Sequence, residues 1–295
     1  MEQQDGFTLF PIGKTAEICG VSARTLRFYE EHGLIRPDKV DQENRYRYYS
    51  YDTMRQIQTI RYLTDEGFTL SQIQQMRKAD DLSHMKELFL AQITETESQI
   101  SYQQRRLASL QAWCSLLIEG NTALEHRDAS IRTRFLPTQS YFHFDFEPAA
   151  KEEHQEAFIE TRYFTESKQH GHSMVDMGGA FIFYYPSFSQ RLDGSSQRIC
   201  LLQETYPGSP SQKNTAPFGG FLAVSCYHIG SPDTISDTYD RMIRWAGEHS
   251  FPLQGSSLER HVLDIYSVDS RDKYVTEILL PTEEDHQDQE LLHQW

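Results

Sequence analysis

A heptad-like run of apolar residues in the first half of the chain constrains its fold more than any other feature. The run spans residues 89–117 and advances by alternating steps of four and three, the spacing of a helix whose seam faces a partner helix. Polar residues on such a seam cost stability but can fix the register. The spacing therefore predicts a coiled coil, and one long helix lying on its own domain is the alternative. The seam positions are Phe89, Ile93, Thr96, Ile100, Gln103, Leu107, Leu110, Cys114 and Leu117.

Two short helices joined by a glycine-containing turn are predicted near the N-terminus. Residues 11–18 place apolar side chains on one side of a helix, and Gly20 begins a turn. Ser22 is a good N-cap for a second helix, which Gly33 ends. This order is the helix-turn-helix signature. The residues expected to reach base edges and phosphates are Ser22, Arg24, Thr25, Arg27 and Tyr29.

Residues 36–50 form a stretch rich in basic and aromatic side chains. The turn-forming pairs Pro37-Asp38 and Glu43-Asn44 predict a β-hairpin wing beside the two helices. Such a wing can contact the DNA backbone. A solvated basic loop is the alternative. The expected wing contacts to DNA are Lys39, Arg45, Tyr46 and Arg47.

The net charge of −15 argues against DNA binding only until the chain is divided. Residues 1–78 hold eleven basic and eleven acidic side chains, so the remaining 217 residues carry the whole excess of acid. An acidic C-terminal part repels phosphate and favours cationic partners, although plain solubility explains it equally well.

Residues 11–78 resemble the winged helix-turn-helix domain of the MerR family. One departure is Arg45, which stands where family members often have glycine before the wing tyrosine. The resemblance implies that the heptad run is an antiparallel dimerisation helix. It also implies that the homodimer bends and untwists promoter DNA so that RNA polymerase can use it. The matching runs are IGKTAEICGVSARTLRFYEEHGLIRPDK, NRYRYYS and IRYLTDEGFTLSQI.

The C-terminal half changes to short apolar runs separated by turns. Its pattern predicts strand-helix-strand-strand, followed by the same order again, which implies two pseudo-symmetric halves. Such a duplication leaves a cleft between its halves for a ligand. The predicted strands are 131–146, 179–186, 198–206, 218–227, 258–266 and 274–280, and the predicted helices are 150–166 and 235–249.

This half resembles the GyrI-like effector-binding domain of multidrug-sensing MerR regulators, through FGGFLAVSCYHIG, TYDRMIRWAGEHS, LERH and YVTEILLP. His261 departs from the tyrosine that family members often have there. The resemblance implies that Glu259 supplies a countercharge for a lipophilic cation, whose charge aromatic ring faces also attract. A surface ion pair is the alternative for Glu259, and most of the aromatics are expected in the core. The candidate pocket tyrosines are Tyr141, Tyr163, Tyr184, Tyr227, Tyr266 and Tyr274.

Catalytic and metal-binding patterns are absent from the sequence. It contains no glycine-rich phosphate loop, HExxH or GxSxG, so we expect no enzyme and no cofactor. Cys114 stands alone on the seam, which makes a poor metal site. Scattered cysteines and the lack of a long apolar run predict a cytoplasmic protein with no membrane contact. A hydrolase or a drug-sequestering domain fused to a DNA-binding module remains the alternative function.

We therefore predict an α+β multidomain protein that regulates transcription in response to a lipophilic, cationic small molecule. It combines a winged helix-turn-helix, a long antiparallel coiled-coil helix and a duplicated strand-helix-strand-strand ligand-binding domain. Its partners are double-stranded promoter DNA, RNA polymerase, the ligand and a second copy. The predicted boundaries are 1–80 for the DNA-binding domain, 81–120 for the dimerisation helix, 121–130 for a linker, 131–282 for the effector domain and 283–295 for an acidic tail.

Overall fold

The computed structural model describes residues 2–4, 7–79, 81–147, 155–172, 177–206 and 213–283. The chain divides into two compact units, Met1–Gln99 and Ile100–Trp295. The predicted acidic tail falls outside the described residues from residue 284 onward. None of the helices in the described part combines the length and apolar composition that a membrane crossing requires.

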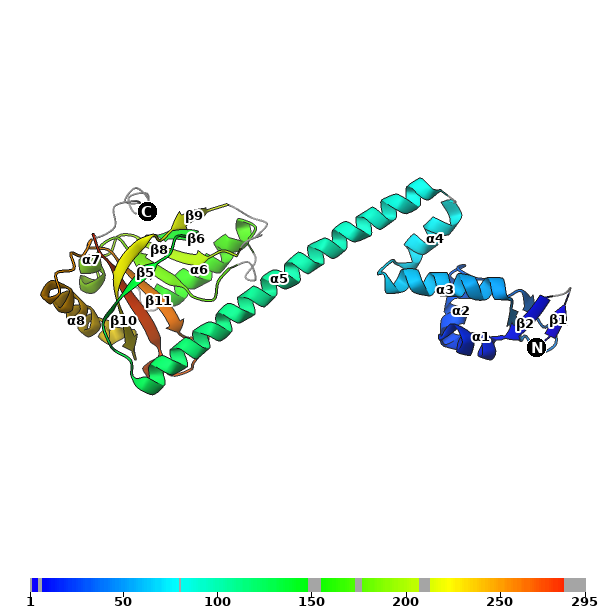
Figure 1. The fold of residues 1–295 in the computed structure, drawn as a ribbon, viewed down its shortest axis with the longest axis horizontal. Helices are drawn as coiled ribbons and strands as arrows, with labels where there is room; N and C mark the ends of the chain where they lie inside the picture. The colour runs from blue at the N-terminus through cyan, green and yellow to red at the C-terminus, as the bar shows by residue number, and fades with distance from the viewer. Residues whose placement is uncertain are drawn as a thin grey trace. The chain divides into compact units, whose positions relative to one another are not determined.

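The N-terminal unit contains the predicted winged helix-turn-helix (Figure 1). Its strands form one antiparallel sheet in the order β1-β2-β4-β3, and the pair β3–β4 is the wing. The helices are α1 (Ile12–Cys19), α2 (Ala23–Glu31), α3 (Tyr51–Asp65) and α4 (Leu70–Ala79), and the strands are β1 (Glu2–Gln4), β2 (Phe7–Pro11), β3 (Lys39–Val40) and β4 (Arg47–Tyr49).

The turn between α1 and α2 depends on Gly20. Its φ of 64° lies in the left-handed region, which glycine adopts without strain. A Cβ there would approach Nη1 of Arg61 to 2.7 Å, and that same nitrogen donates to the carbonyl of Cys19 at 3.1 Å. The turn is therefore held from α3 as well as by its own backbone.

Helix α5 (Leu82–His126) is continuous over 45 residues. Its first turns pack Met85, Leu88 and Phe89 against the core of the N-terminal unit. Its last turns bury Leu116 and Ala123 against the sheet of the C-terminal unit. The predicted long helix is confirmed, and it ends at His126 rather than at residue 120.

The C-terminal unit is an eight-stranded antiparallel sheet in the order β5-β10-β12-β11-β7-β8-β6-β9. The predicted strand-helix-strand-strand order is confirmed in both halves, which meet where β11 pairs with β7. Two strand expectations were wrong: the strand predicted over 131–146 is divided into β5 and β6, and the strand predicted over 218–227 begins at Phe221, because Phe218 ends a separate strand, β9. Short helix α7 (Phe188–Asp193) was not predicted. The remaining elements are β5 (Arg132–Leu136), β6 (Gln139–Phe146), α6 (Gln155–Gln169), β7 (Ile182–Tyr185), β8 (Ile199–Glu204), β9 (Thr215–Phe218), β10 (Phe221–Ile229), α8 (Ile235–Glu248), β11 (Ser257–Leu263) and β12 (Val275–Pro281).

The two faces of this sheet are covered by different helices. Residues directly opposite one another in a ladder point to the same side, and β11 pairs Glu259 with Phe183 on β7 and with Ile278 on β12. Phe183 packs with Tyr163 of α6, and Ile278 packs with Tyr239 of α8, so Glu259 lies on the α6/α8 face. The neighbouring positions in the strands form the other face, where α5 packs.

Candidate functional site

Helix α2 presents a polar surface that begins at a capped N-terminus. The Ser22 hydroxyl accepts a hydrogen bond from the backbone N–H of Thr25 at 2.9 Å and contacts its hydroxyl at 2.8 Å. Arg24 and Arg27 are exposed, one turn apart. Tyr29 is not presented with them, because its ring is buried in the core of the unit. Tyr29 therefore packs in the core of the unit, and its expected DNA contact stays a prediction.

The wing is attached to α2 through an ion pair. The Arg47 guanidinium donates from Nε to the Glu30 carboxylate at 2.6 Å, so it reaches α2. Lys39 lies 5.9 Å from the centre of the Tyr48 ring, and Tyr46 is exposed.

Arg45 adopts a φ of 61°, the left-handed region that favours glycine. This geometry explains the glycine expected at that place in the wing turn. Here a basic side chain takes the position at the cost of backbone strain.

Asp38 fixes the base of the wing to the first turn of α3. Its carboxylate accepts from the Ser50 N–H at 2.8 Å, from the Ser50 hydroxyl at 3.0 Å and from the Thr53 hydroxyl at 2.8 Å. Ser50 is also the N-cap of α3. The sequence had marked Asp38 only as a turn former.

Replacing Asp38 with alanine is expected to loosen the wing, because three hydrogen bonds to a charged acceptor are lost. We expect the N-terminal unit to lose about 1–2 kcal/mol of stability. Hydrogen–deuterium exchange should accelerate in residues 39–49 and leave the C-terminal sheet unchanged. Asp65→Ala, which removes an exposed carboxylate on α3, is the control. Unchanged exchange in the wing would contradict this role.

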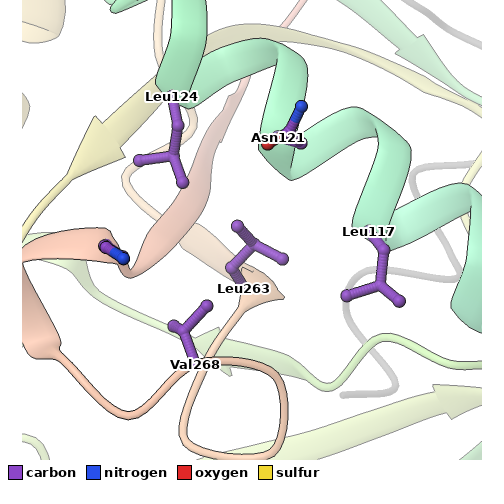
Figure 2. Close-up of a pocket in the computed structure, with 6 residues that line it drawn as sticks. Leu117, Asn121, Leu124, Leu263 and Val268 are labelled. Carbon is purple, nitrogen blue, oxygen red and sulfur yellow. The ribbon is translucent and has the colours of Figure 1, made fainter.

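A pocket of about 560 Å³ opens beside the end of α5. Figure 2 shows Leu117 and Leu124 directed from the helix toward Leu263 and Val268. None of its lining residues is among the predicted ligand-binding residues. Leu117 is a predicted seam residue, so the pocket continues the apolar seam of α5. The lining residues are Leu117, Asn121, Leu124, Leu263, Val268 and Lys273.

Glu259 was expected to face an open cleft, but in the structure it does not. Only 2% of its surface is exposed, and its carboxylate is held by Arg191 of α7. Arg191 donates from Nε at 2.9 Å and from Nη2 at 3.2 Å. The Tyr239 hydroxyl donates to the same carboxylate at 2.9 Å. A carboxylate on a buried, otherwise apolar face of a sheet requires such partners, because burying an unpaired charge carries a large free-energy penalty.

Aromatic rings complete the surroundings of this ion pair. The Arg191 guanidinium lies 5.1 Å from the centre of the Tyr185 ring, and Tyr185 is buried. Burial raises the pKa of Tyr239 well above its ordinary value, and the adjacent Glu259 carboxylate raises it further. Tyr239 therefore remains a protonated hydrogen-bond donor.

The predicted pocket tyrosines do not share one site. Tyr163 packs on the α6/α8 face. The half-exposed ring of Tyr266 contacts the rings of Phe164 and Phe181 on the same face. Tyr141 and Tyr184 lie in the core cluster of the opposite face. On that opposite face, the Tyr227 hydroxyl donates to Glu119 of α5 at 2.6 Å. Tyr274 is half-buried just before β12.

A second charged network lies under α5. Glu277 is fully buried and accepts from Arg260 at 2.7 Å, from the Ser225 hydroxyl at 2.7 Å and from Arg134. Arg260 also pairs with Glu119 of α5. Burial alone would raise the pKa of Glu277, but Arg260 and Arg134 hold it below its ordinary value. The network links the sheet to the long helix.

The sequence analysis did not identify the side chains that bind the buried carboxylates of Glu259 and Glu277. Arg191, Tyr185 and Tyr239 come from three different elements, so no spacing along the chain relates them to Glu259. Glu277 lay within the quoted YVTEILLP run, and its place inside an apolar strand was the available signal. Within the described ranges, no cluster of three or more His, Cys, Asp or Glu side chains could hold a metal ion.

Comparison with known proteins finds a family match in the N-terminal unit. The family model described as MerR HTH family regulatory protein matches residues 10–80. A probable heavy metal-dependent transcriptional regulator from Haemophilus influenzae is 31% identical over 107 residues, which cover 35% of this chain and 83% of that protein.

Two multidrug-efflux transporter regulators from Bacillus subtilis are also similar. The transporter 1 regulator is 35% identical over 108 residues, covering 37% of this chain and only 37% of its own length. The transporter 2 regulator is 24% identical over 284 residues, covering 93% of this chain and 97% of its own length.

Proposed function

This chain belongs to the MerR family of helix-turn-helix regulatory proteins, and we propose that it regulates transcription as a promoter-bound homodimer that responds to a small molecule. The observation that carries the proposal is the capped helix α2, which exposes Arg24 and Arg27 beside a basic wing. Paired recognition helices and wings would bind a palindromic promoter site, where RNA polymerase is the further partner.

The division of contacts follows from the geometry of the unit. The N-terminal turn of a recognition helix reaches base edges in the major groove, which assigns sequence reading to Arg24 and Arg27. Lys39, Arg45 and Tyr46 of the wing supply contacts to phosphates, which position the protein. Thr25 and Ser22 stabilise the first turn of α2, and Arg47 holds the wing to it.

Dimerisation is supported by the apolar face that α5 leaves uncovered within one chain. A large apolar surface at heptad spacing is expected to be buried by a second helix. The pocket beside Leu117 continues this face and would receive the partner's apolar side chains. Phe89 is already packed against Phe68 of its own unit, with ring centres 4.8 Å apart. The exposed seam residues are Ile93, Ile100, Leu107, Leu110 and Leu117.

The effector is proposed to bind the α6/α8 face of the C-terminal sheet. Glu259 supplies a negative charge there, and the rings of Tyr163, Tyr185 and Tyr239 supply aromatic surface. These features favour a lipophilic cation. The names of the Bacillus subtilis relatives, which regulate multidrug-efflux transporters, support the same ligand class.

A signal from the sheet has a physical route to α5. Glu119 of α5 contacts both Arg260 and Tyr227, and Gly120 packs directly on Leu263. A shift in β11 would therefore move the end of the helix, whose first turns belong to the DNA-binding unit.

Arg24→Ala tests the DNA-binding part of the proposal. We expect the Kd for duplex DNA, selected from a random pool by the wild-type protein, to rise by about fivefold or more, because one base contact contributes about 1–3 kcal/mol. Fluorescence anisotropy with labelled duplex measures it. Arg55→Ala is the control, because this arginine on α3 is 85% exposed and is not assigned to DNA. Equal losses in both variants would reject the assignment of α2.

A further inference from the structure

The buried site around Glu259 already contains a cation, and that cation belongs to the protein. Arg191 makes a two-pronged contact with the carboxylate, at 2.9 and 3.2 Å, and lies over the face of Tyr185 at 5.1 Å. Tyr239 donates to the carboxylate from the other side at 2.9 Å. A planar cation between a carboxylate and an aromatic face has the arrangement that such a group prefers.

The parts of this site differ in how firmly they are held. Glu259 and Tyr185 belong to central strands β11 and β7, and Tyr239 belongs to α8; all three are almost completely buried. Arg191 belongs to α7, a helix of six residues, none of which is buried. Its side chain remains 22% exposed. The anionic and aromatic walls therefore lie in the core, whereas the cation is on the least buried of the four elements that build the site, a helix that packs on the core only through the partly buried Phe188 and Leu192.

We propose that Arg191 is an internal occupant of a cation-binding site, and that the ligand of this site is a planar, delocalised cation of the amidinium or guanidinium type that replaces it beside Glu259. The proposal rests on the proposed effector function and adds to it the competing residue and the chemistry of the group that is recognised. The ligand takes over both hydrogen bonds and the Tyr185 ring face, and Arg191 moves into solvent with α7.

Two consequences follow from this competition. The apparent association constant of the wild-type protein for a cation equals that of the open site multiplied by the fraction of molecules in which Arg191 has left the site. A neutral ligand of the same shape is rejected because it would leave Glu259 buried without a positive charge. Arg191 therefore sets both the cation concentration at which the site is filled and its preference for cations over neutral ligands.

The test compares benzamidine, a small aromatic amidinium, with benzamide, its neutral counterpart, by calorimetry on the full-length protein. Arg191→Ala is expected to bind benzamidine at least tenfold more tightly than the wild type, and neither protein is expected to bind benzamide. Arg198→Ala is the matched control, because Arg198 follows α7 but pairs at the surface with Asp145 at 2.9 Å. Its affinity should equal that of the wild type.

The double variant Arg191→Ala, Glu259→Gln locates the effect, because it also removes the buried charge; it should lose the gain entirely. Arg191→Lys keeps a charge without the planar fork and should show a smaller gain, which provides a second measurement if the alanine variant does not fold. The proposal is overturned if neither single variant binds benzamidine more tightly than the wild type, or if the double variant retains the gain. DNA binding by Arg191→Ala, measured in parallel, separates that outcome from failure of the proposed regulatory function.

Discussion

Glu277→Gln is expected to destabilise the C-terminal unit by about 3 kcal/mol, the lower end of the range for breaking a buried ion pair. The substitution keeps the shape of the side chain but leaves the buried guanidinium of Arg260 facing a neutral amide. The loss stays near the lower end because Arg260 retains Glu119, and Arg134 is partly exposed to water.

Urea unfolding followed by tryptophan fluorescence measures this loss selectively, because all tryptophans lie at residue 113 or later. Glu248→Gln removes an exposed carboxylate of the same unit and serves as the control. A loss no greater than that of the control would show that the buried network contributes nothing to stability.

The same residue predicts a pH dependence. Because the pKa of Glu277 is lower in the folded protein than its ordinary value of 4.5, its charge stabilises folding fully above that pH. The contribution is lost as the pH falls below 4.5 through the folded pKa. The difference in unfolding free energy between wild type and Glu277→Gln should therefore be constant near neutral pH and shrink in acid.

The second large effect is expected at the seam of α5. Ile100 and Leu107 are 53% and 56% exposed within one chain, and they occupy equivalent heptad positions. Replacing both with glutamate places charges in the proposed dimer interface, where burial without a partner is strongly unfavourable. We expect a monomer in sedimentation equilibrium. Binding to palindromic DNA should fall by about a hundredfold or more, because linked half-site binding is lost.

The control for the seam carries the same two charges on the outer side of the helix. Ser98→Glu with Tyr102→Glu changes two exposed positions outside the heptad seam. This variant should remain dimeric and keep its affinity for DNA. A seam variant that stays dimeric would place the dimer interface on another face of the molecule.

The order of the elements could be predicted along the chain because each depends on local spacing. Ser22 and Gly33 mark the ends of α2, and the heptad run marks α5, through interactions within a few residues. The repeated strand-helix-strand-strand order was visible for the same reason. The break between β5 and β6 was not, because β5 pairs with β10 and β6 with β8, partners distant in sequence.

The residues of the C-terminal site were predicted less well. Glu259 was identified by resemblance, but its surroundings depend on strand pairing, which puts Tyr185 and Arg191 beside it from β7 and α7. Alternation within a strand tells which residues share a face and leaves open which face a ligand reaches. For this reason the predicted tyrosines were divided between the two faces of the sheet.

By itself, the sequence determined the family, the helix-turn-helix, the long helix and the duplicated architecture, since capping, heptad spacing and alternation act over short distances. Only the tertiary structure decided that Tyr29 is buried, that Glu277 lies between two arginines, and that Glu259 is already neutralised by Arg191. The physical reason is that the charge available to a ligand depends on which opposite charges the fold brings within hydrogen-bonding distance.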